Sequence, residues 1–195
     1  GPELQKILGA ARGRGDIVNK AQYIAVGATH PTAAEEMYAL EFPAAKRIDV
    51  DLHVTPPGLE ARFIRTTAEG KLPELVALLG ECKKDGHLRG GRVIIFCITI
   101  SSSRFVDHFL SESGYTTSCV HGEIPPDRRS AEFNAFKDGK TQLLVCTDIA
   151  ARGLDNLEIA HVVIFDFPTS AVDYIHRAGR TARADADPPV RARRA

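Results

Sequence analysis

The sequence lacks an excess of charge of either sign and has no long hydrophobic run. Its 195 residues carry 25 lysines and arginines against 25 aspartates and glutamates, so any nucleic-acid-binding surface has to be a local patch. No apolar run approaches the roughly 18 residues that a membrane-spanning helix needs, and the N-terminus shows no secretory signal pattern. We therefore expect no membrane association and an intracellular protein, with cytoplasm, nucleus and mitochondrion all left open.

The sequence also lacks a C-x-x-C pair. Its four cysteines are Cys82, Cys97, Cys119 and Cys146, and three of them lie inside apolar runs. This placement favours buried, reduced thiols over a metal site or a disulfide framework. We therefore predict no metal site.

From residue 92 onward, short apolar runs alternate with helical patterns. We predict strands at 92–97, 116–121, 142–147 and 161–165, and helices at 101–113, behind a serine cap and stopped by Gly114, at 125–136 and at 170–180. The strands do not alternate polar with apolar residues, which indicates a parallel sheet covered by helices on both faces. In such doubly wound α/β sheets ligands bind at the carboxyl ends of the strands. We therefore expect the functional site in the loops that follow residues 97, 121, 147 and 165.

The first ninety residues follow a different pattern. We predict a short strand at 24–28, amphipathic helices at 31–42 and 71–84, and a further strand at 59–67. The sequence Pro56-Pro57-Gly58 interrupts the chain, and we place a domain boundary near residues 51–60. A piece of about fifty residues with one strand and one or two helices is too small to bury its own core. We expect it to be the end of a preceding domain.

Five motifs occur in order near the predicted strand ends: VIIFCIT (93–99), VHGEIPPDRR (120–129), CTDIAARGLD (146–155), VVIFDFP (162–168) and YIHRAGRTAR (174–183). Together they resemble the C-terminal RecA-like domain of the DEAD-box RNA helicases of superfamily 2. Tyr174, His176 and Arg177 favour this branch over the DEAH-box and RecQ helicases, which usually begin the last motif with Gln. VGATHP (26–31) resembles the Ser-Ala-Thr motif of the family's first RecA-like domain, and GPELQKIL (1–8) resembles the helix after its Asp-Glu-Ala-Asp box.

The resemblance implies a RecA-like fold, and it divides the chain into four segments. Residues 1–52 are the end of the first RecA-like domain, 53–60 a linker, 61–187 the second RecA-like domain and 188–195 a basic tail. The segment ADADPPVRARRA (184–195) is too short for both the strand and the helix with which the family usually continues. Exposed strand edges also make a strand-swapped dimer of this fragment an expected partner state.

The activity that the resemblance implies is ATP-dependent RNA remodelling by the parent protein. Its partners are RNA and the first RecA-like domain, and its cofactors are ATP and Mg²⁺, both held mainly by that first domain. The sequence contains neither a phosphate loop nor an Asp-Glu-Ala-Asp box. We therefore expect this chain alone to be inactive.

For the nucleotide, the resemblance assigns Arg180 and Arg183 as arginine fingers that reach the γ-phosphate. It places Asp155 at the ribose and Gly153 in the turn before it. His176 and Arg177 belong to the same cofactor site, where they hold the motif and the domain interface. Two plainer interpretations stay open: the arginines at spacing three form a solvated helix face, and Asp155 only forms an Asx turn.

For RNA, the resemblance assigns contacts to Thr147, Arg129, Thr99, Gly122 and Arg152, and it assigns Gly27, Ala28 and Thr29 to the domain interface. The sequence departs from the family pattern in that Pro126 replaces a Gln, Ile98 an Asn, Ala182 a Gly and Gly27 a Ser. Alternatively, Arg129 pairs with Glu132 or Glu123 on the surface, and Thr99 only caps a helix.

Two other functions stay open at this point. The same surface suits a non-catalytic module that binds RNA or a regulator without hydrolysis. The other alternative is an unrelated doubly wound protein, such as one that binds a small phosphate ligand. It predicts nucleotide binding by this chain alone.

Overall fold

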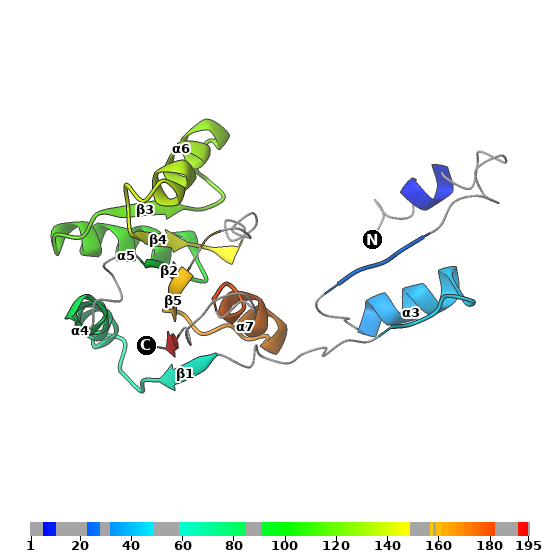
Figure 1. Cartoon of the computed structure of the whole chain (residues 1–195), viewed down its shortest axis with the longest axis horizontal. Helices are drawn as coiled ribbons and strands as arrows, with labels where there is room; N and C mark the ends of the chain where they lie inside the picture. Colours follow the sequence, from blue (N-terminus) through cyan, green and yellow to red (C-terminus); the bar gives the residue numbers. More distant parts are fainter. Residues whose placement is uncertain are drawn as a thin grey trace. The chain divides into compact units, whose positions relative to one another are not determined.

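The computed structural model describes residues 6–10, 23–27, 32–48, 59–84, 91–148, 157, 159–181 and 191–194. The chain divides into two compact units, Gly1–Leu52 and His53–Ala195. The first unit contains helix α3 (Thr32–Glu41), as its amphipathic pattern predicts (Figure 1). Residues 23–27 form no strand, although we predicted one at 24–28. An extended segment becomes a strand only beside a hydrogen-bonded neighbour, and the described part of this unit provides none.

The second unit is built on a six-stranded sheet with the order β1-β6-β5-β2-β4-β3. The strands are β1 (Glu60–Phe63), β2 (Arg92–Phe96), β3 (Thr117–Val120), β4 (Leu143–Cys146), β5 (Ile159–Ile164) and β6 (Arg191–Arg194). All five neighbouring pairs run parallel. The central strand β2 pairs through Ile94 with Leu144 of β4 on one side and Val162 of β5 on the other. The predicted parallel α/β sheet is confirmed.

Strand β6 lies in the segment that we expected to be a basic tail, residues 188–195. Its first residue, Arg191, pairs with Glu60 of β1 and with His161 of β5. The segment is too short for a strand and a helix together, but four residues suffice for a strand because neighbours on both sides supply hydrogen-bond partners. Tertiary pairing here outweighs the local composition.

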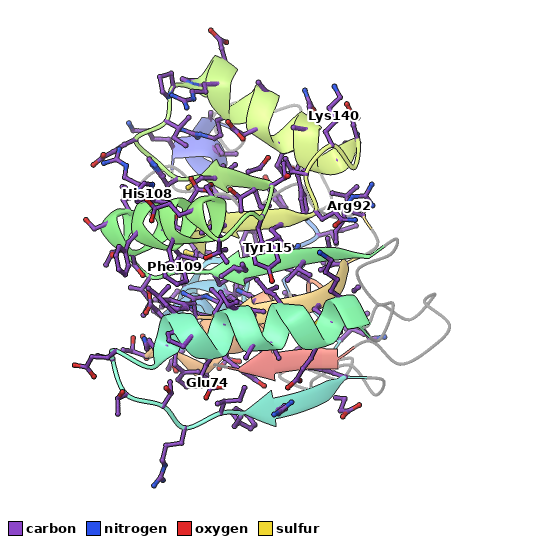
Figure 2. All side chains as sticks on the ribbon, turned by 90° about the vertical axis from the view of Figure 1, so that its left-hand side faces the viewer. Glu74, Arg92, His108, Phe109, Tyr115 and Lys140 are labelled. Carbon is purple, nitrogen blue, oxygen red and sulfur yellow. The ribbon has the colours of Figure 1, made fainter. Side chains whose placement is uncertain are left out.

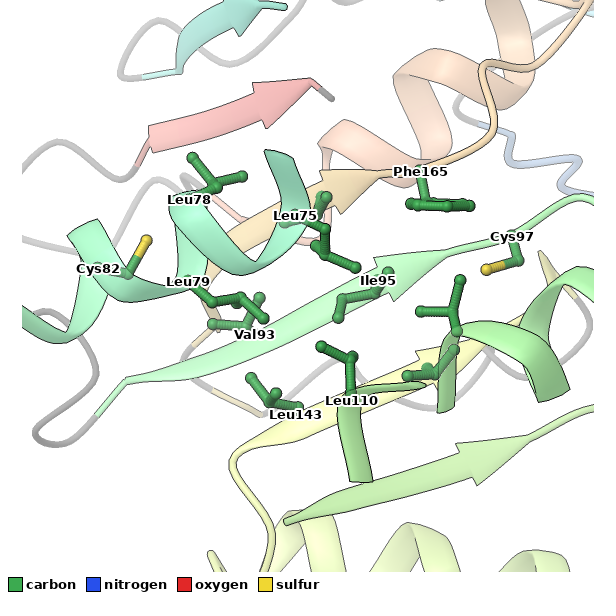
Figure 3. Packing of buried hydrophobic residues seen from close by; sticks show 13 residues of the cluster. Leu75, Leu78, Leu79, Cys82, Val93, Ile95, Cys97, Leu110, Leu143 and Phe165 are labelled. Atoms are coloured by element: carbon green, nitrogen blue, oxygen red, sulfur yellow. The ribbon is translucent and has the colours of Figure 1, made fainter. Parts of the chain in front are cut away.

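Helices cover both faces of the sheet. They are α4 (Lys71–Lys84), α5 (Ile100–Glu112), α6 (Pro126–Lys137) and α7 (Ala171–Ala178). Helices α4 and α5 pack on one face, where Leu75, Leu79 and Leu110 meet Val93 and Ile95 of β2 (Figure 3). On the other face Phe136 of α6 and Tyr174 of α7 pack with Ile94 and Phe96. Successive residues of β2 therefore serve opposite faces, as a strand requires.

The ends of the helices are fixed by local hydrogen bonds. Thr99 caps α5, because its hydroxyl accepts a 3.0 Å hydrogen bond from the Ser102 amide; the predicted serine cap is therefore wrong. Gly114 follows the helix with φ at +83°, which suits glycine, and its role as a stop signal is confirmed. At the end of α6, Arg92 donates from Nε to the Phe136 carbonyl at 2.9 Å and from Nη2 to the Lys137 carbonyl at 2.8 Å (Figure 2).

Arg177 of α7 connects three elements at the other end of the sheet. Its Nε and Nη2 each donate to a carboxylate oxygen of Asp148, after β4, at 2.7 Å. Its Nη1 donates to the Asp166 carbonyl, after β5, at 2.9 Å. The guanidinium carbon lies 5.5 Å from the ring centroid of Phe96, and the residue is only 3% exposed. Arg177 therefore holds α7 against the ends of β4, β5 and β2.

No helix in the described ranges is long and apolar enough to cross a membrane.

We expect Arg177→Met to lower the free energy of unfolding by about 2–3 kcal/mol. Methionine keeps much of the volume, but it leaves the Asp166 carbonyl and the Asp148 carboxylate without their donor. Asp148 is half exposed, and water therefore compensates for part of the loss. Urea unfolding of the purified chain, followed by circular dichroism, measures this change.

The matched control is Arg62→Met. Arg62 also forms an ion pair, with Glu81 at 3.1 Å, but both side chains are about half exposed. We expect this substitution to cost no more than about 1 kcal/mol. Equal losses for the two variants would show that Arg177 contributes no more than a surface ion pair.

Candidate functional site

The carboxyl ends of four neighbouring parallel strands form one edge of the sheet. Thr99 follows β2, Gly122 follows β3, Thr147 follows β4 and Asp166 follows β5. These four strands are adjacent in the order β5-β2-β4-β3. The loops that the sequence singled out therefore share one edge, which is where ligands bind in open parallel sheets.

Among the described carboxylates of this edge, Asp166 accepts the most hydrogen bonds. Lys71 Nζ lies 3.0 Å from its Oδ1, and the Ile98 amide and the Ser102 hydroxyl donate to its Oδ2. Burial by itself raises the pKa of this carboxyl, but the hydrogen bonds from Ser102, Lys71 and Ile98 outweigh it and hold the pKa below its usual value. Asp166 is therefore ionised at neutral pH.

Sequence reasoning assigned no role to Asp166 or Lys71. The sequence could have indicated Asp166 as a site residue, because its carboxylate comes directly after the apolar run of β5 and therefore lies at a strand end. Lys71 gives no such signal, since it lies 95 residues away in the sequence. Its ammonium also sits 5.0 Å from the centroid of the Phe165 ring.

A second polar group lies at the end of β3. Arg104 of α5 donates from Nε to His121 Nε2 at 3.3 Å, and its Nη2 lies 2.8 Å from the Glu123 carboxylate. Burial of the imidazole, and next the positive charge of Arg104, lower the pKa of His121. The imidazole is therefore neutral at pH 7, with its proton on Nδ1, because Nε2 accepts. Sequence reasoning missed this arrangement too.

Arg129 forms hydrogen bonds within its own loop. Its Nη2 donates to the carbonyls of Ile124, at 2.9 Å, and Gly122, at 3.3 Å. Within the described residues it makes no ion pair with Glu123 or Glu132, so the surface pairing that we considered is not found. The guanidinium fixes the loop between β3 and α6, and it stays partly exposed at the edge.

The arginine row does not form one solvated helix face. Helix α7 ends at Ala178 and is capped by Gly179, so Arg180 lies beyond the helix. Arg177 is buried, and its donors are engaged by Asp148 and Asp166. Arg180 is half-buried, and its Nε donates to the His176 carbonyl at 3.1 Å. Two arginines three residues apart thus occupy different environments.

The other predicted site residues differ in exposure. Thr99 and His176 are exposed, whereas Thr147 is only 6% exposed and its amide donates to the Val120 carbonyl. Gly27 is exposed in the first unit. The remaining predicted positions lie outside the described residues: Arg183, Asp155, Gly153, Arg152, Ala28 and Thr29.

The four cysteines are free thiols, three of them buried. Burial is the main cause that raises the pKa of Cys97 and of Cys119 to about 12, and it also raises the pKa of Cys146 well above its usual value. These thiols are neutral at pH 7 and are poor nucleophiles. Within the part of the chain that the structure describes, no group of three His, Cys, Asp or Glu side chains is placed to hold a metal ion.

Comparisons with known proteins agree with this geometry. Residues 70–185 match the family described as the helicase conserved C-terminal domain. DEAD-box ATP-dependent RNA helicase 39 of Arabidopsis thaliana is 40% identical over 192 residues, which are 95% of this chain and 30% of that protein. The chain thus spans about a third of the length of this relative.

Two solved structures extend the comparison. The E. coli DEAD-box protein SrmB, determined bound to regulator of ribonuclease activity A, is 30% identical with a TM-score of 0.58, over 72% of this chain and 76% of that one. A variant of S. cerevisiae Dbp5, bound to RNA and ADP BeF3, is 25% identical with a TM-score of 0.74, over 87% of this chain and 44% of that one. An unrelated doubly wound fold is therefore excluded. This chain belongs to the helicase C-terminal domain family and carries the C-terminal RecA-like domain of a DEAD-box helicase.

Proposed function

We propose that this chain serves as the second RecA-like domain of an ATP-dependent RNA helicase. The observation that carries the proposal is the hydrogen-bonded pair of Arg177 and Asp148. This pair holds α7 at the carboxyl edge of the sheet, and Arg180 follows directly after the end of that helix. The relatives named above, a DEAD-box RNA helicase and a Dbp5 variant bound to RNA and a nucleotide analogue, support the same role. The organisation into residues 1–52, 53–60 and 61–187 is part of this proposal.

In this role Arg180 and Arg183 donate to the γ-phosphate of ATP when the first RecA-like domain closes on the edge. A planar guanidinium supplies paired donors to the charge that develops during phosphoryl transfer. The His176 carbonyl restrains the Arg180 side chain by accepting a hydrogen bond from its Nε. Asp155 accepts from the ribose hydroxyls. ATP would supply the phosphoryl group, and Mg²⁺, held mainly by the first domain, would neutralise its charge.

RNA lies along the same edge in this proposal. Thr99, Gly122 and Arg129 are available there, and Thr147 and Arg152 belong to the same set. Hydroxyls, backbone amides and guanidinium groups bind phosphate oxygens without reading the base sequence. Gly27, Ala28 and Thr29 belong to the interface between the two domains in this proposal. The buried free thiols suit a reducing intracellular compartment.

We expect Arg180→Ala to lower RNA-stimulated ATP turnover about a thousandfold in a protein that joins this chain to a first RecA-like domain. Arg180→Lys should recover little activity, because an ammonium lacks the planar paired donors. Steady-state ATP hydrolysis with saturating RNA measures both. Arg62→Ala, an exposed arginine on β1 that pairs with Glu81 of α4, is the control and should keep the parental rate. A folded Arg180→Ala protein with near-parental turnover would refute the finger role.

We expect Arg129→Ala to weaken RNA binding uniformly across RNA sequences and to leave nucleotide binding unchanged. If Arg129 contacts a phosphate, the slope of log affinity against log salt falls by about one. If Arg129 only fixes its loop, the affinity falls with an unchanged slope. Arg128→Ala, an exposed neighbour on the same helix, is the control, and an equal change in slope for it would contradict a specific contact.

We expect the purified 195-residue chain to hydrolyse no ATP above background, with or without RNA. Its sequence contains neither a G-x-x-x-x-G-K-[ST] loop nor an Asp-Glu-Ala-Asp box, and positioning of the nucleotide supplies nearly all of phosphoryl-transfer catalysis. A phosphate-release assay checks this. Hydrolysis that co-purifies with the chain and is stimulated by RNA would contradict the proposed division of labour between the domains.

A further inference from the structure

The Asp166 side chain holds the loop between β2 and α5 on both sides of Thr99. Its Oδ2 accepts hydrogen bonds from the Ile98 amide, at 3.2 Å, and from the Ser102 hydroxyl in the first turn of α5. Ile98 directly precedes Thr99 in the sequence, and Ser102 follows it three positions later. One carboxylate oxygen from the end of β5 therefore fixes the chain before and after Thr99.

The Thr99 side chain depends on the same support. Its Oγ1 accepts a 3.0 Å hydrogen bond from the Ser102 amide. Ser102 is thus held by Asp166 through its hydroxyl and holds Thr99 through its amide. Because the Thr99 oxygen accepts in this contact, its hydroxyl proton is left to donate, and Thr99 is exposed at the edge of the sheet. Asp166 therefore fixes the direction in which this hydroxyl donates.

Lys71 removes the electrostatic cost of placing a carboxylate beside this loop. An isolated, ionised carboxylate would repel an anion that approaches Thr99. Lys71 Nζ lies 3.0 Å from Oδ1 of Asp166, the oxygen that does not hold the loop, and the two side chains are 33% and 19% exposed. Asp166 can therefore organise the loop while its charge is neutralised by its neighbour.

We propose that Asp166 is the positioning residue for the RNA contact of Thr99. The proposal rests on the proposed function, because it takes from there the expectation that the Thr99 hydroxyl donates to an RNA phosphate. Asp166 acts through Ile98 and Ser102 and contacts no RNA itself. This role is favoured over a general stabilising one, because both donors to Oδ2 flank Thr99.

The sign of the change in RNA affinity tests this role. Asp166→Ala removes a negative charge and frees Lys71, so electrostatics alone predicts tighter binding with a steeper dependence on salt. Loss of positioning predicts the opposite, a weakening of about tenfold, which corresponds to one hydrogen bond to a charged group. Fluorescence anisotropy of the 195-residue chain with a fluorescein-labelled single-stranded oligouridine measures the change. The Asp166 carbonyl, which accepts from Arg177, is unaffected by the substitution.

A double-mutant cycle with Thr99→Val separates positioning from a general loss of structure. Thr99→Val removes the hydroxyl and should itself weaken RNA binding about tenfold. In that background Asp166→Ala should cause no further loss, because the contact that it supports is already absent. Asp166→Asn keeps an oxygen for the Ile98 amide and the Ser102 hydroxyl, and it should retain most of the parental affinity. If Asp166→Ala does not fold, Ser102→Ala takes its place in the cycle, because it removes one of the two links.

The matched control is Asp138→Ala. Asp138 is another carboxylate beside a lysine, with Lys140 Nζ at 3.7 Å, but it follows α6 at the amino end of β2, where Arg92 binds the Lys137 carbonyl. Its removal should leave RNA affinity unchanged. Unchanged or tighter RNA binding by folded Asp166→Ala, or an equal loss in the Thr99→Val background, would overturn the positioning role and leave the RNA surface standing. Absence of RNA binding by the parental chain would overturn the RNA surface, and the role of Asp166 with it.

Discussion

The pair of hydrogen bonds between Arg177 and Asp148 is the interaction on which the edge of the sheet depends. A guanidinium that is 3% exposed needs a hydrogen-bond partner for each of its three nitrogens, and the carboxylate after β4 and the carbonyl after β5 provide one for each. The end of α7 is thereby fixed relative to two strands. Because Arg180 follows only three residues later, its placement at the edge is a consequence of this buried contact.

Charge at this edge is organised in local pairs. Lys71 faces Asp166, and Arg104 faces Glu123 while it also donates to His121. Each of these two carboxylates thus neutralises a nearby cation. The pairs also restrict what the edge binds. A phosphate is attracted where a guanidinium stays exposed, and it gains little from Lys71, whose charge Asp166 already neutralises.

Much of the fold follows from the order of apolar runs. The strands around Ile94, Leu144 and Val162 were predictable, because continuous apolar runs between helical patterns require a parallel sheet. Strand β6 was not predictable, since its four residues gain their structure from β1 and β5 on either side. Conversely, residues 23–27 have strand-like composition without a described neighbour to pair with. Pairing between distant segments therefore decides whether a short segment becomes a strand.

The sequence by itself determined the family and the edge at which the site lies, because the motifs occur in order at strand ends and parallel strands end together. It did not determine the roles of residues within a motif. Arg177 and Arg180 share a residue type and a spacing, yet one is buried and the other lies beyond the helix. The hydrogen-bond partners of the two arginines produce this difference. Asp148 lies 29 residues from Arg177 in the sequence, and Lys71 lies 95 residues from Asp166. Only folding brings such groups within hydrogen-bonding distance.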